Sequence, residues 1–233
     1  MQDKQTDIID LSSSLQDIWR VLTDKERETL RRHARVAHFT KNELIYLEGE
    51  MPLDLMCLFK GKVKIFKNGV GGRSQIIRII RPMQYFGYRA FFAREPYITS
   101  ASAFESCTVC FIPMEVIETL LKRNAPLALF FVRLLAVDLG IADQRVVNLT
   151  QKHVRGRLAE SLLFLKESYG MEEDGATINI YLAREDLANL SNMTTSNAIR
   201  TLSMFVNERL ITIDGRKIKI IDEERLRKIS RIG

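Results

Sequence analysis

The chain contains one stretch, residues 126–149, in which Gly140 is the only glycine and no proline follows the first residue. Apolar residues recur along it at alternating spacings of three and four, which is the heptad spacing of helices that pack along a seam. The seam residues are Val132, Leu135, Leu139, Ala142, Val146 and Leu149. A helix of about 25 residues extends roughly 37 Å, more than a small domain needs for itself. The fold must therefore accommodate a long helix with an apolar side.

This seam has two interpretations. In the first, it faces the same helix of a second copy, and the protein is a parallel homodimer. In the second, it packs on the chain's own β-rich half, because Phe130, Phe131 and Leu134 lie off the seam and also need cover. We predict the homodimer, in which Gly140 and Ala142 would allow two helix backbones to approach closely.

Composition limits the class of protein. Of 233 residues, 46% are hydrophobic and 27% are charged, a balance that supports a packed core and, at this length, two compact units with a connector. The formal net charge of +6 permits binding to nucleic acid without requiring it. No apolar run approaches the ~18 residues of a membrane span, and the N-terminus lacks a signal-peptide pattern. We expect a cytoplasmic protein with no membrane partner.

Cysteine and histidine give little indication of a reactive site. Cys107 and Cys110 have a spacing found in metal sites, but their apolar neighbours indicate a buried strand, where positions three apart point to opposite faces. No catalytic triad, phosphate-binding loop or zinc-protease motif is present. We predict no metal, no cofactor and no enzymatic activity. An alternative stays open in which His33, His38 or His153 ligates a heme, and a heme or small-ligand sensor acts mainly through a protein partner.

The first half of the chain changes from helical to β-rich. Apolar residues recur at helical spacing over residues 15–22, and Thr23 and Glu26 match a capping box that begins a second helix. From residue 36 to 113, short β-branched and aromatic runs alternate with glycine, proline and Asn-Gly turn signals. This pattern predicts a β-sandwich or small barrel.

The C-terminal part predicts a helix at residues 154–169, ended by Gly170, and a strand at residues 177–182. Residues 184–205 then have the pattern of two helices joined by a tight turn. At the turn, Asn192 tolerates the left-handed conformation that such a turn requires, and Thr194 is a suitable N-cap for the second helix.

The second helix of this pair carries polar side chains that can bind bases in the major groove of DNA. With Thr194 as the cap, its first exposed turns carry Thr195, Ser196, Asn197 and Arg200. Arginine can pair with guanine and asparagine with adenine in the major groove, while hydroxyls are less selective. Two alternating strands follow around Asp214-Gly215, and Arg216 lies in that hairpin, which is the pattern of a wing. We predict a winged helix-turn-helix.

Taken together, these motifs resemble the Crp/Fnr family of bacterial transcription regulators over nearly the full length. The resemblance is carried by residues 47–50 (LEGE), 60–63 (KGKV), 86–87 (FG) and 156–159 (GRLA), and by the helix-turn-helix and wing. It implies a cyclic-nucleotide-binding-type barrel, double-stranded DNA with a two-fold symmetric operator as the target, and RNA polymerase as a partner. It also implies that Arg184 holds a phosphate and that Arg200 reads a guanine.

The sequence departs from the cyclic-AMP-binding members of that family. Tyr88 follows Gly87 where those members have a glutamate for the ribose, and Tyr97 and Ile98 stand where an Arg-Ser pair would hold the phosphate. A buried cyclic phosphate needs compensated charge, so we predict that the effector is not cyclic AMP. The cavity is then filled by its own aromatic side chains or adapted to another small molecule, with Arg89 as the anion contact.

The expected fold class is α+β, with an N-terminal double-stranded β-helix (jelly-roll) barrel, a long dimerisation helix and a C-terminal winged helix-turn-helix. The expected domains are residues 1–122 for the sensor barrel with its N-terminal helices, 123–153 for the dimerisation helix and hinge, and 154–233 for the DNA-binding domain. The expected function is that of a homodimeric, sequence-specific DNA-binding transcription regulator.

Overall fold

The computed structural model describes residues 15–69 and 74–232. Its contacts divide the chain into two compact units, Met1–Lys67 with Ile77–Leu139, and Asn68–Ile76 with Gly140–Gly233. The boundary falls inside the long helix α6 (Ala125–Gln151), which contributes to both units. The division into residues 1–122, 123–153 and 154–233 remains a prediction.

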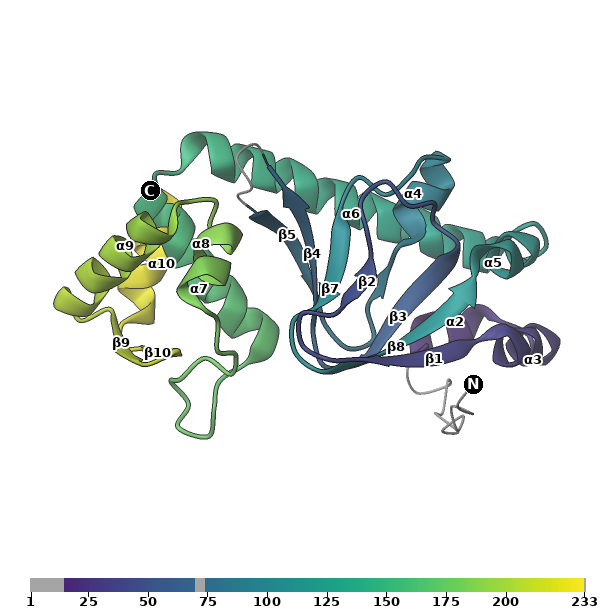
Figure 1. The fold of residues 1–233 in the computed structure, drawn as a ribbon, viewed down its shortest axis with the longest axis horizontal. Helices are drawn as coiled ribbons and strands as arrows, with labels where there is room; N and C mark the ends of the chain where they lie inside the picture. Colours follow the sequence, from purple (N-terminus) through teal and green to yellow (C-terminus); the bar gives the residue numbers. More distant parts are fainter. Residues whose placement is uncertain (1–14, 70–73, 233) are drawn as a thin grey trace. The chain divides into compact units, whose positions relative to one another are not determined.

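Two four-stranded sheets lie within residues 35–113, nearly all of them in the first unit (Figure 1). In spatial order, one sheet contains β1 (Arg35–Phe39), β8 (Cys107–Pro113), β3 (Asp54–Lys60) and β6 (Tyr85–Phe86), and the other contains β2 (Leu44–Tyr46), β7 (Ser100–Ala103), β4 (Val63–Asn68) and β5 (Ser74–Ile80). Strands that are neighbours in space are mostly distant in sequence, as expected for the predicted jelly roll.

Buried side chains form two cores, one on each face of the first sheet. Met56, Leu58 and Val109 contribute to a core shared with the second sheet, while Leu55 and Ile112 contribute to a core shared with the helices. This alternation is the two-residue period of a strand that is buried on both faces. The continuous apolar run of β8 is explained by burial on both sides.

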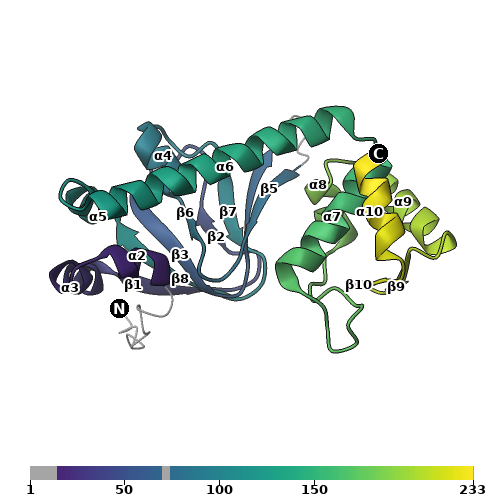
Figure 2. The same cartoon turned by 180° about the vertical axis from the view of Figure 1, so that it is seen from behind.

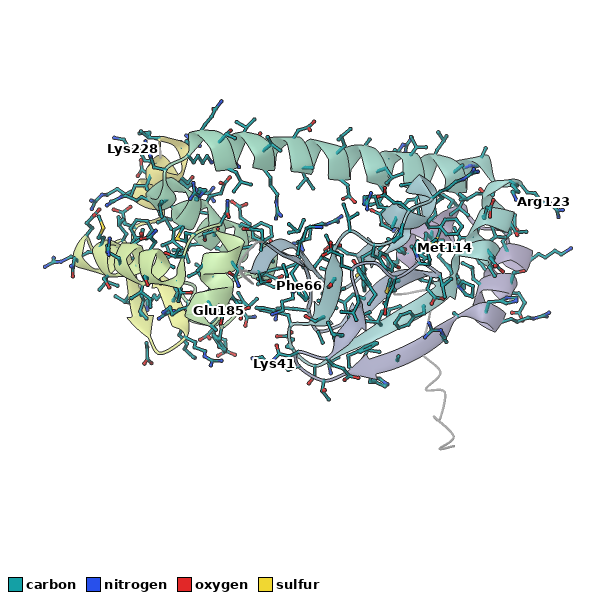
Figure 3. The ribbon with its side chains drawn as sticks, turned by 45° about the horizontal axis from the view of Figure 1, so that its top comes forward. Lys41, Phe66, Met114, Arg123, Glu185 and Lys228 are labelled. Atoms are coloured by element: carbon teal, nitrogen blue, oxygen red, sulfur yellow. The ribbon has the colours of Figure 1, made fainter. Side chains whose placement is uncertain are left out.

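Helices close one face of this unit. They are α2 (Gln16–Val21), α3 (Asp24–His33), α4 (Tyr88–Ala93), α5 (Met114–Leu121) and the first part of α6. The predicted capping box at Thr23 and Glu26 is present, which supplies partners to amide groups that the first turn of α3 would leave unsatisfied. Met114, fully buried, begins α5, and Arg123 follows its end (Figure 3).

The first part of α6 packs on this core through the residues expected to need cover. Phe131 is 3% exposed, and Phe130 and Leu134 pack against the same cluster. Figure 2 shows this part of the helix running across the strands of the unit. Leu135 belongs to the predicted seam, yet it also packs partly against this core. The seam therefore cannot face only a second copy of the chain.

The remaining apolar side of α6 is exposed. Val132, Leu139 and Val146 are 60%, 63% and 61% exposed. By length and composition α6 could cross a membrane, with a mean hydropathy of 1.9 over its best window. The expectation that no stretch reaches this limit is therefore wrong, because Arg133 and Asp138 interrupt the apolar run without lowering its mean hydropathy enough.

The second unit is built around α7 (Val154–Tyr169). The other elements are α8 (Arg184–Leu190), α9 (Thr195–Asn207), β9 (Ile211–Asp214), β10 (Lys217–Ile220) and α10 (Glu223–Ile232). Leu158 and Leu162 of α7 are fully buried, as are Leu187 of α8 and Phe205 of α9. Ion pairs from α7 to α10, Lys166 with Glu223 and Glu167 with Arg227, hold the last helix in place.

The strand predicted at residues 177–182 is absent. Thr177 forms an isolated bridge with Lys219, and Ile178 forms one with Met171. The segment meets the free edge of β10 only briefly, through hydrogen bonds from the Ile178 amide to the Ile218 carbonyl oxygen and from the Ile220 amide to the Ala176 carbonyl oxygen, and a strand needs a longer run of such pairs. The alternating pattern instead reflects the burial of Ile178, Ile180 and Leu182 beneath an irregular segment.

The cysteine environment generates a test of the fold. Cys57 and Cys110 lie opposite each other on β3 and β8 in the helix-covered core, and Cys107 lies in the core between the sheets. The prediction that Cys107 and Cys110 point to opposite faces is confirmed. Burial raises the pKa of Cys107 to about 11 and of Cys110 to about 12, and burial and Cys110 raise the pKa of Cys57.

Because the thiolate is the reactive form, a thiol with a pKa of about 11 is ionised to roughly one part in a thousand at pH 8. We expect the native protein to react slowly with a chromogenic disulfide reagent at pH 8. The same protein in denaturant should react rapidly at all three cysteines. Rapid labelling of any cysteine under native conditions would contradict the described cores.

Candidate nucleic-acid interface and ligand pocket

The predicted helix-turn-helix is formed by α8 and α9 (Figure 1). Asn192 takes a left-handed conformation at the turn, with φ of 49°. The backbone amide of Met193 then donates to the Ala188 carbonyl oxygen, which returns the chain over α8. Thr194 caps α9 by accepting a hydrogen bond from the Asn197 amide at 3.3 Å. Both predictions for the turn are therefore confirmed.

Arg157 of α7 donates hydrogen bonds to the carbonyl oxygens of this turn. Its Nε donates to the Ser191 carbonyl oxygen and its Nη2 to that of Asn192, both at 3.1 Å. The Ser191 hydroxyl also donates to Ser161 Oγ at 2.8 Å. Charge-assisted bonds to carbonyl oxygens satisfy a turn that would otherwise leave them without partners. Arg157 was not predicted to have this role, although it lies in the GRLA run noted in the sequence.

The two faces of α9 differ in chemistry. Ala198, Thr201, Leu202 and Phe205 are buried. Thr195, Ser196 and Arg200 are exposed on the other side, and Asn197 is half-buried. Figure 3 shows the side chains of this unit, with Glu185 labelled at the second position of α8. The structure thus brings the predicted base-reading residues together on one exposed helix end.

The C-terminal end of α9 is held to α7 by an ion pair. Arg155 Nη1 donates to Glu208 Oε1 at 2.6 Å, and the Arg155 guanidinium lies over the Phe205 ring. This hydrogen bond lowers the pKa of Glu208 and raises that of Arg155. The pair fixes the direction of α9 relative to α7, and with it the direction of the exposed face.

The hairpin differs slightly from the predicted wing. Asp214 pairs with Lys217, so the two turn residues are Gly215, with φ of 54°, and Arg216, rather than Asp214 and Gly215. Arg216 is exposed at the tip. Arg184, at the start of α8, donates from Nη2 to the Gly215 carbonyl oxygen at 2.8 Å, while its Nη1 is buried without a hydrogen-bond partner among the described residues. Arg184 therefore connects α8 to the hairpin turn.

The net positive charge of the second unit is small, so DNA binding would depend on where its cations lie. From Gln151 to the C-terminus there are 14 Lys and Arg residues against 12 Asp and Glu residues, a net charge of +2. Several of these cations are neutralised locally, such as Lys217 by Glu172 and Lys219 by Asp174. In the part of the chain that the structure describes, Arg200 and Arg216 form no ion pair and are exposed.

The ligand pocket expected in the barrel contains a polar cluster at Tyr88. Tyr88 is 1% exposed, and its hydroxyl donates to Asp138 Oδ2 at 2.7 Å. Arg78 Nη1 lies 2.6 Å from the same carboxylate oxygen. Burial, together with the hydrogen bond and charge of Asp138, raises the pKa of Tyr88. The cluster joins β5, α4 and α6 within the first unit, and the sequence predictions included neither Arg78 nor Asp138.

A second aromatic pair occupies the space next to Gly87. The rings of Tyr46 and Tyr97 stack with centroids 3.9 Å apart, and both side chains are 7% exposed. A Cβ atom at Gly87, whose φ is 87°, would lie 2.4 Å from Met56 Cε and 3.2 Å from the Tyr97 hydroxyl. The left-handed conformation therefore favours glycine here, and the close approach of the Tyr97 hydroxyl leaves little room for a side chain. Burial raises the pKa of Tyr46 and of Tyr97.

The remaining two pocket candidates are both about half exposed. Arg89 pairs with Glu95 at 2.7 Å, and its side chain is about half exposed. Ile98 is 50% exposed, and its carbonyl oxygen accepts a hydrogen bond from Lys67. Of the five predicted pocket residues, Gly87 lies beside Tyr97 in the core between the sheets, Tyr88 packs in the helix-covered core, and Arg89 and Ile98 are about half exposed.

The histidines proposed as heme ligands lie on separate elements. His33 is on α3 and contacts the Thr29 carbonyl oxygen, His38 is on β1 and contacts Thr108, and His153 precedes α7. Among the described residues, no group of three or more His, Cys, Asp or Glu side chains is placed to hold a metal ion. The heme alternative stays a hypothesis from the sequence.

Two family models match the chain. A cyclic nucleotide-binding domain model matches residues 36–124, and a Crp-like helix-turn-helix domain model matches residues 156–229. The first match spans both sheets and α5, and the second spans α7 to the middle of α10.

The chain is also similar to curated transcription regulators and to a solved structure. The chain is 26% identical to the CRP-like cAMP-activated global transcriptional regulator of Mycobacterium tuberculosis, with 83% of this chain and 87% of the relative covered. It is 28% identical to the anaerobic regulatory protein of Bacillus subtilis, with 75% and 74% covered. Its fold matches FixK2 from Bradyrhizobium japonicum with a TM-score of 0.76 and 21% identity, over 84% of this chain and 96% of that one.

Proposed function

The chain belongs to the Crp/Fnr family of transcription regulators, and from this premise we propose that it is a homodimer that binds a two-fold symmetric DNA site and does not respond to cyclic AMP. The observation that carries the proposal is the exposed N-terminal end of α9. There Thr195, Ser196 and Arg200 face away from the core, on a helix whose direction is set by Arg155 and Arg157.

Each interface residue has a role in this proposal. Arg200 pairs with a guanine, Asn197 contributes an amide near the cap, and the hydroxyls of Thr194, Thr195 and Ser196 contact bases or phosphates. The familiar operators of the family are not assumed, because Thr195 and Ser196 replace the residues that usually occupy those positions. Selection of bound sequences from a random DNA pool, using the full-length protein, tests whether any sequence is preferred.

Arg184 and Arg216 act at the hairpin. The bond from Arg184 to the Gly215 carbonyl oxygen holds the hairpin turn beside the start of α8. Arg184 is half-buried at the start of α8, where a helix N-terminus favours an anion. Arg184 would therefore position the wing through Gly215 and add positive charge where the DNA backbone would pass.

The homodimer is supported by the exposed side of α6. Apolar side chains of this extent are seldom left in water on a soluble protein, and heptad-spaced ones fit a parallel helix pair. Val132, Leu139, Ala142, Val146 and Leu149 are all exposed in the single chain. A second copy would cover them, and the alternative use of α6 as a membrane span would have to bury Arg133 and Asp138 in lipid.

The loss of cyclic-AMP binding is supported by the contents of the pocket. A cyclic nucleotide would need a carboxylate for its ribose and a guanidinium for its phosphate. The stacked rings of Tyr46 and Tyr97 lie in the core between the sheets, and the Tyr88 hydroxyl bonds to Asp138 in the helix-covered core. Asp138 also neutralises the Arg78 guanidinium. In this proposal the protein acts in the cytoplasm with RNA polymerase as its partner, and is not an enzyme.

The homodimer predicts the effect of a charge on the seam. Leu139→Lys should give a folded monomer that no longer protects a two-fold symmetric site, because burying an unpaired ammonium between helices is unfavourable and one reading domain alone binds weakly. Sedimentation equilibrium measures the mass. Gln144→Lys adds the same charge away from the seam and should remain dimeric. A monomeric unmodified protein at micromolar concentration would contradict the dimer.

The roles of the two arginines predict different losses. Arg200→Ala should cost about 1–3 kcal/mol on the selected site and relax the preference at one base pair. Arg184→Ala should weaken all sequences alike and reduce the salt dependence of binding. Arg231→Ala, near the end of α10, removes an equal charge as a control. Binding is measured by fluorescence anisotropy at several salt concentrations, and an equal, sequence-independent loss for Arg200→Ala would exclude base reading.

The pocket predicts the outcome of a titration with cyclic AMP. Two missing charge-assisted contacts at buried positions should remove any affinity in the micromolar range. Isothermal titration calorimetry should therefore detect no saturable binding, while the cAMP-activated relative from Mycobacterium tuberculosis provides the positive control. Saturable 1:1 binding with a Kd below about 10 μM would show that the tyrosines do not replace the nucleotide.

A further inference from the structure

One apolar side chain stands on the reading face of α9. Ile199 is 48% exposed and lies outside the buried face formed by Ala198, Leu202 and Phe205. We propose that Ile199 determines specificity by contacting the 5-methyl group of a thymine in the major groove. This inference rests on the proposed function, because it assigns a contact within the same DNA interface.

The position of Ile199 follows from helix geometry. Residues three and four apart share a face of a helix, and Ser196, Ile199, Arg200 and Ser203 have this spacing. Ser203 Oγ donates to the Ile199 carbonyl oxygen at 3.0 Å, which directs that hydroxyl back to the backbone. Ile199 is thus the apolar member of an otherwise polar surface beside Arg200, a residue proposed to read a base.

An exposed isoleucine is not unusual on a protein surface by itself. Its place makes it informative here, because the first two turns of the second helix enter the groove in this class of fold. Ile199 is not among the buried residues of α9, so the core behind this helix does not account for an isoleucine at this position. Its branched side chain is also restricted to few rotamers, so little conformational freedom is lost when it meets the DNA.

The major groove offers one apolar group on the edges of the base pairs, the 5-methyl of thymine. The hydroxyls of Thr195 and Ser196 cannot distinguish thymine from uracil, since the two bases present the same carbonyl oxygen there. An isoleucine can distinguish thymine from uracil, because binding is stabilised when its side chain removes the thymine methyl group from water. The gain expected for one methyl-sized group corresponds to about a fourfold change in Kd for each half-site.

The experiment uses the full-length protein and a duplex chosen from a random DNA pool. Each thymine of the selected site is replaced in turn by uracil, symmetrically in both half-sites, which removes only the methyl group. We expect one position at which uracil weakens binding about fourfold per half-site, while the others change little. Ile199→Ala should bind the thymine and uracil versions of that site equally.

Two further variants control for side effects. Met204→Ala shortens another exposed apolar residue of α9, 43% exposed and more than one turn beyond Ile199, away from the N-terminal turns, and should keep the discrimination of the unmodified protein. Ile199→Val retains branched methyl groups and should keep part of it. Because Ile199 is 48% exposed and outside the buried face of α9, both variants should fold, which thermal unfolding of each variant checks.

The outcomes are distinguishable. If uracil is neutral at every position, or if Ile199→Ala still discriminates, the assignment to Ile199 is wrong while the proposed function stands, since a selected sequence binds. If the pool yields no preferred sequence, the proposed function fails and the contact with thymine fails with it. Discrimination at one position that is lost only when Ile199 is shortened to alanine supports the contact.

Discussion

Burial of Phe131 sets the course of the long helix. Its ring meets the edges of Tyr88, Phe92 and Phe130 at centroid distances between 5.3 and 5.9 Å. These contacts hold the first part of α6 on the core of the first unit, where aromatic pairs add to the energy of burial. Beyond Leu135 the helix makes few such contacts, and its apolar side chains remain exposed. Both the seam that we assign to a second copy and the position of Asp138 follow from this arrangement.

Asp138 is the centre of a polar cluster inside the first unit. Its carboxylate accepts the Tyr88 hydroxyl and lies against Arg78, so a cation, an anion and a phenol satisfy one another inside the unit. A buried charge is tolerated when it is paired and hydrogen-bonded. The pairing neutralises Arg78 within the chain and connects β5 and α4 to α6. Under the proposed function, this cluster takes the place of a bound nucleotide.

The reading surface depends on residues that do not themselves face the DNA. Arg157 satisfies the carbonyl oxygens of the turn, and Arg155 holds the far end of α9 through Glu208. Because both arginines come from α7, the direction of α9 is determined by the core of the second unit. The exposed side chains can then be short and few, and a modest net charge of +2 is sufficient if Arg184, Arg200 and Arg216 are placed correctly.

Local patterns in the sequence determined the elements and the caps. The capping box at Thr23, the left-handed turn at Asn192 and the N-cap at Thr194 were predictable because each depends on residues within a few positions of one another. The long helix was predictable from its heptad spacing. The predicted strand at residues 177–182 was wrong, because alternation records burial but does not supply a pairing partner.

Contacts between residues distant in sequence were decided only by the tertiary structure. Nothing near Asp138 in the sequence identifies Tyr88 and Arg78, 50 and 60 positions away, as its partners. Arg157 likewise meets the turn 34 positions later. The exposure of Ile199 also needed the fold, since an isoleucine in a helix is expected in the core unless the packing of its neighbours is known. Such pairings depend on how elements are brought together, which is a property of the whole chain and not of any window within it.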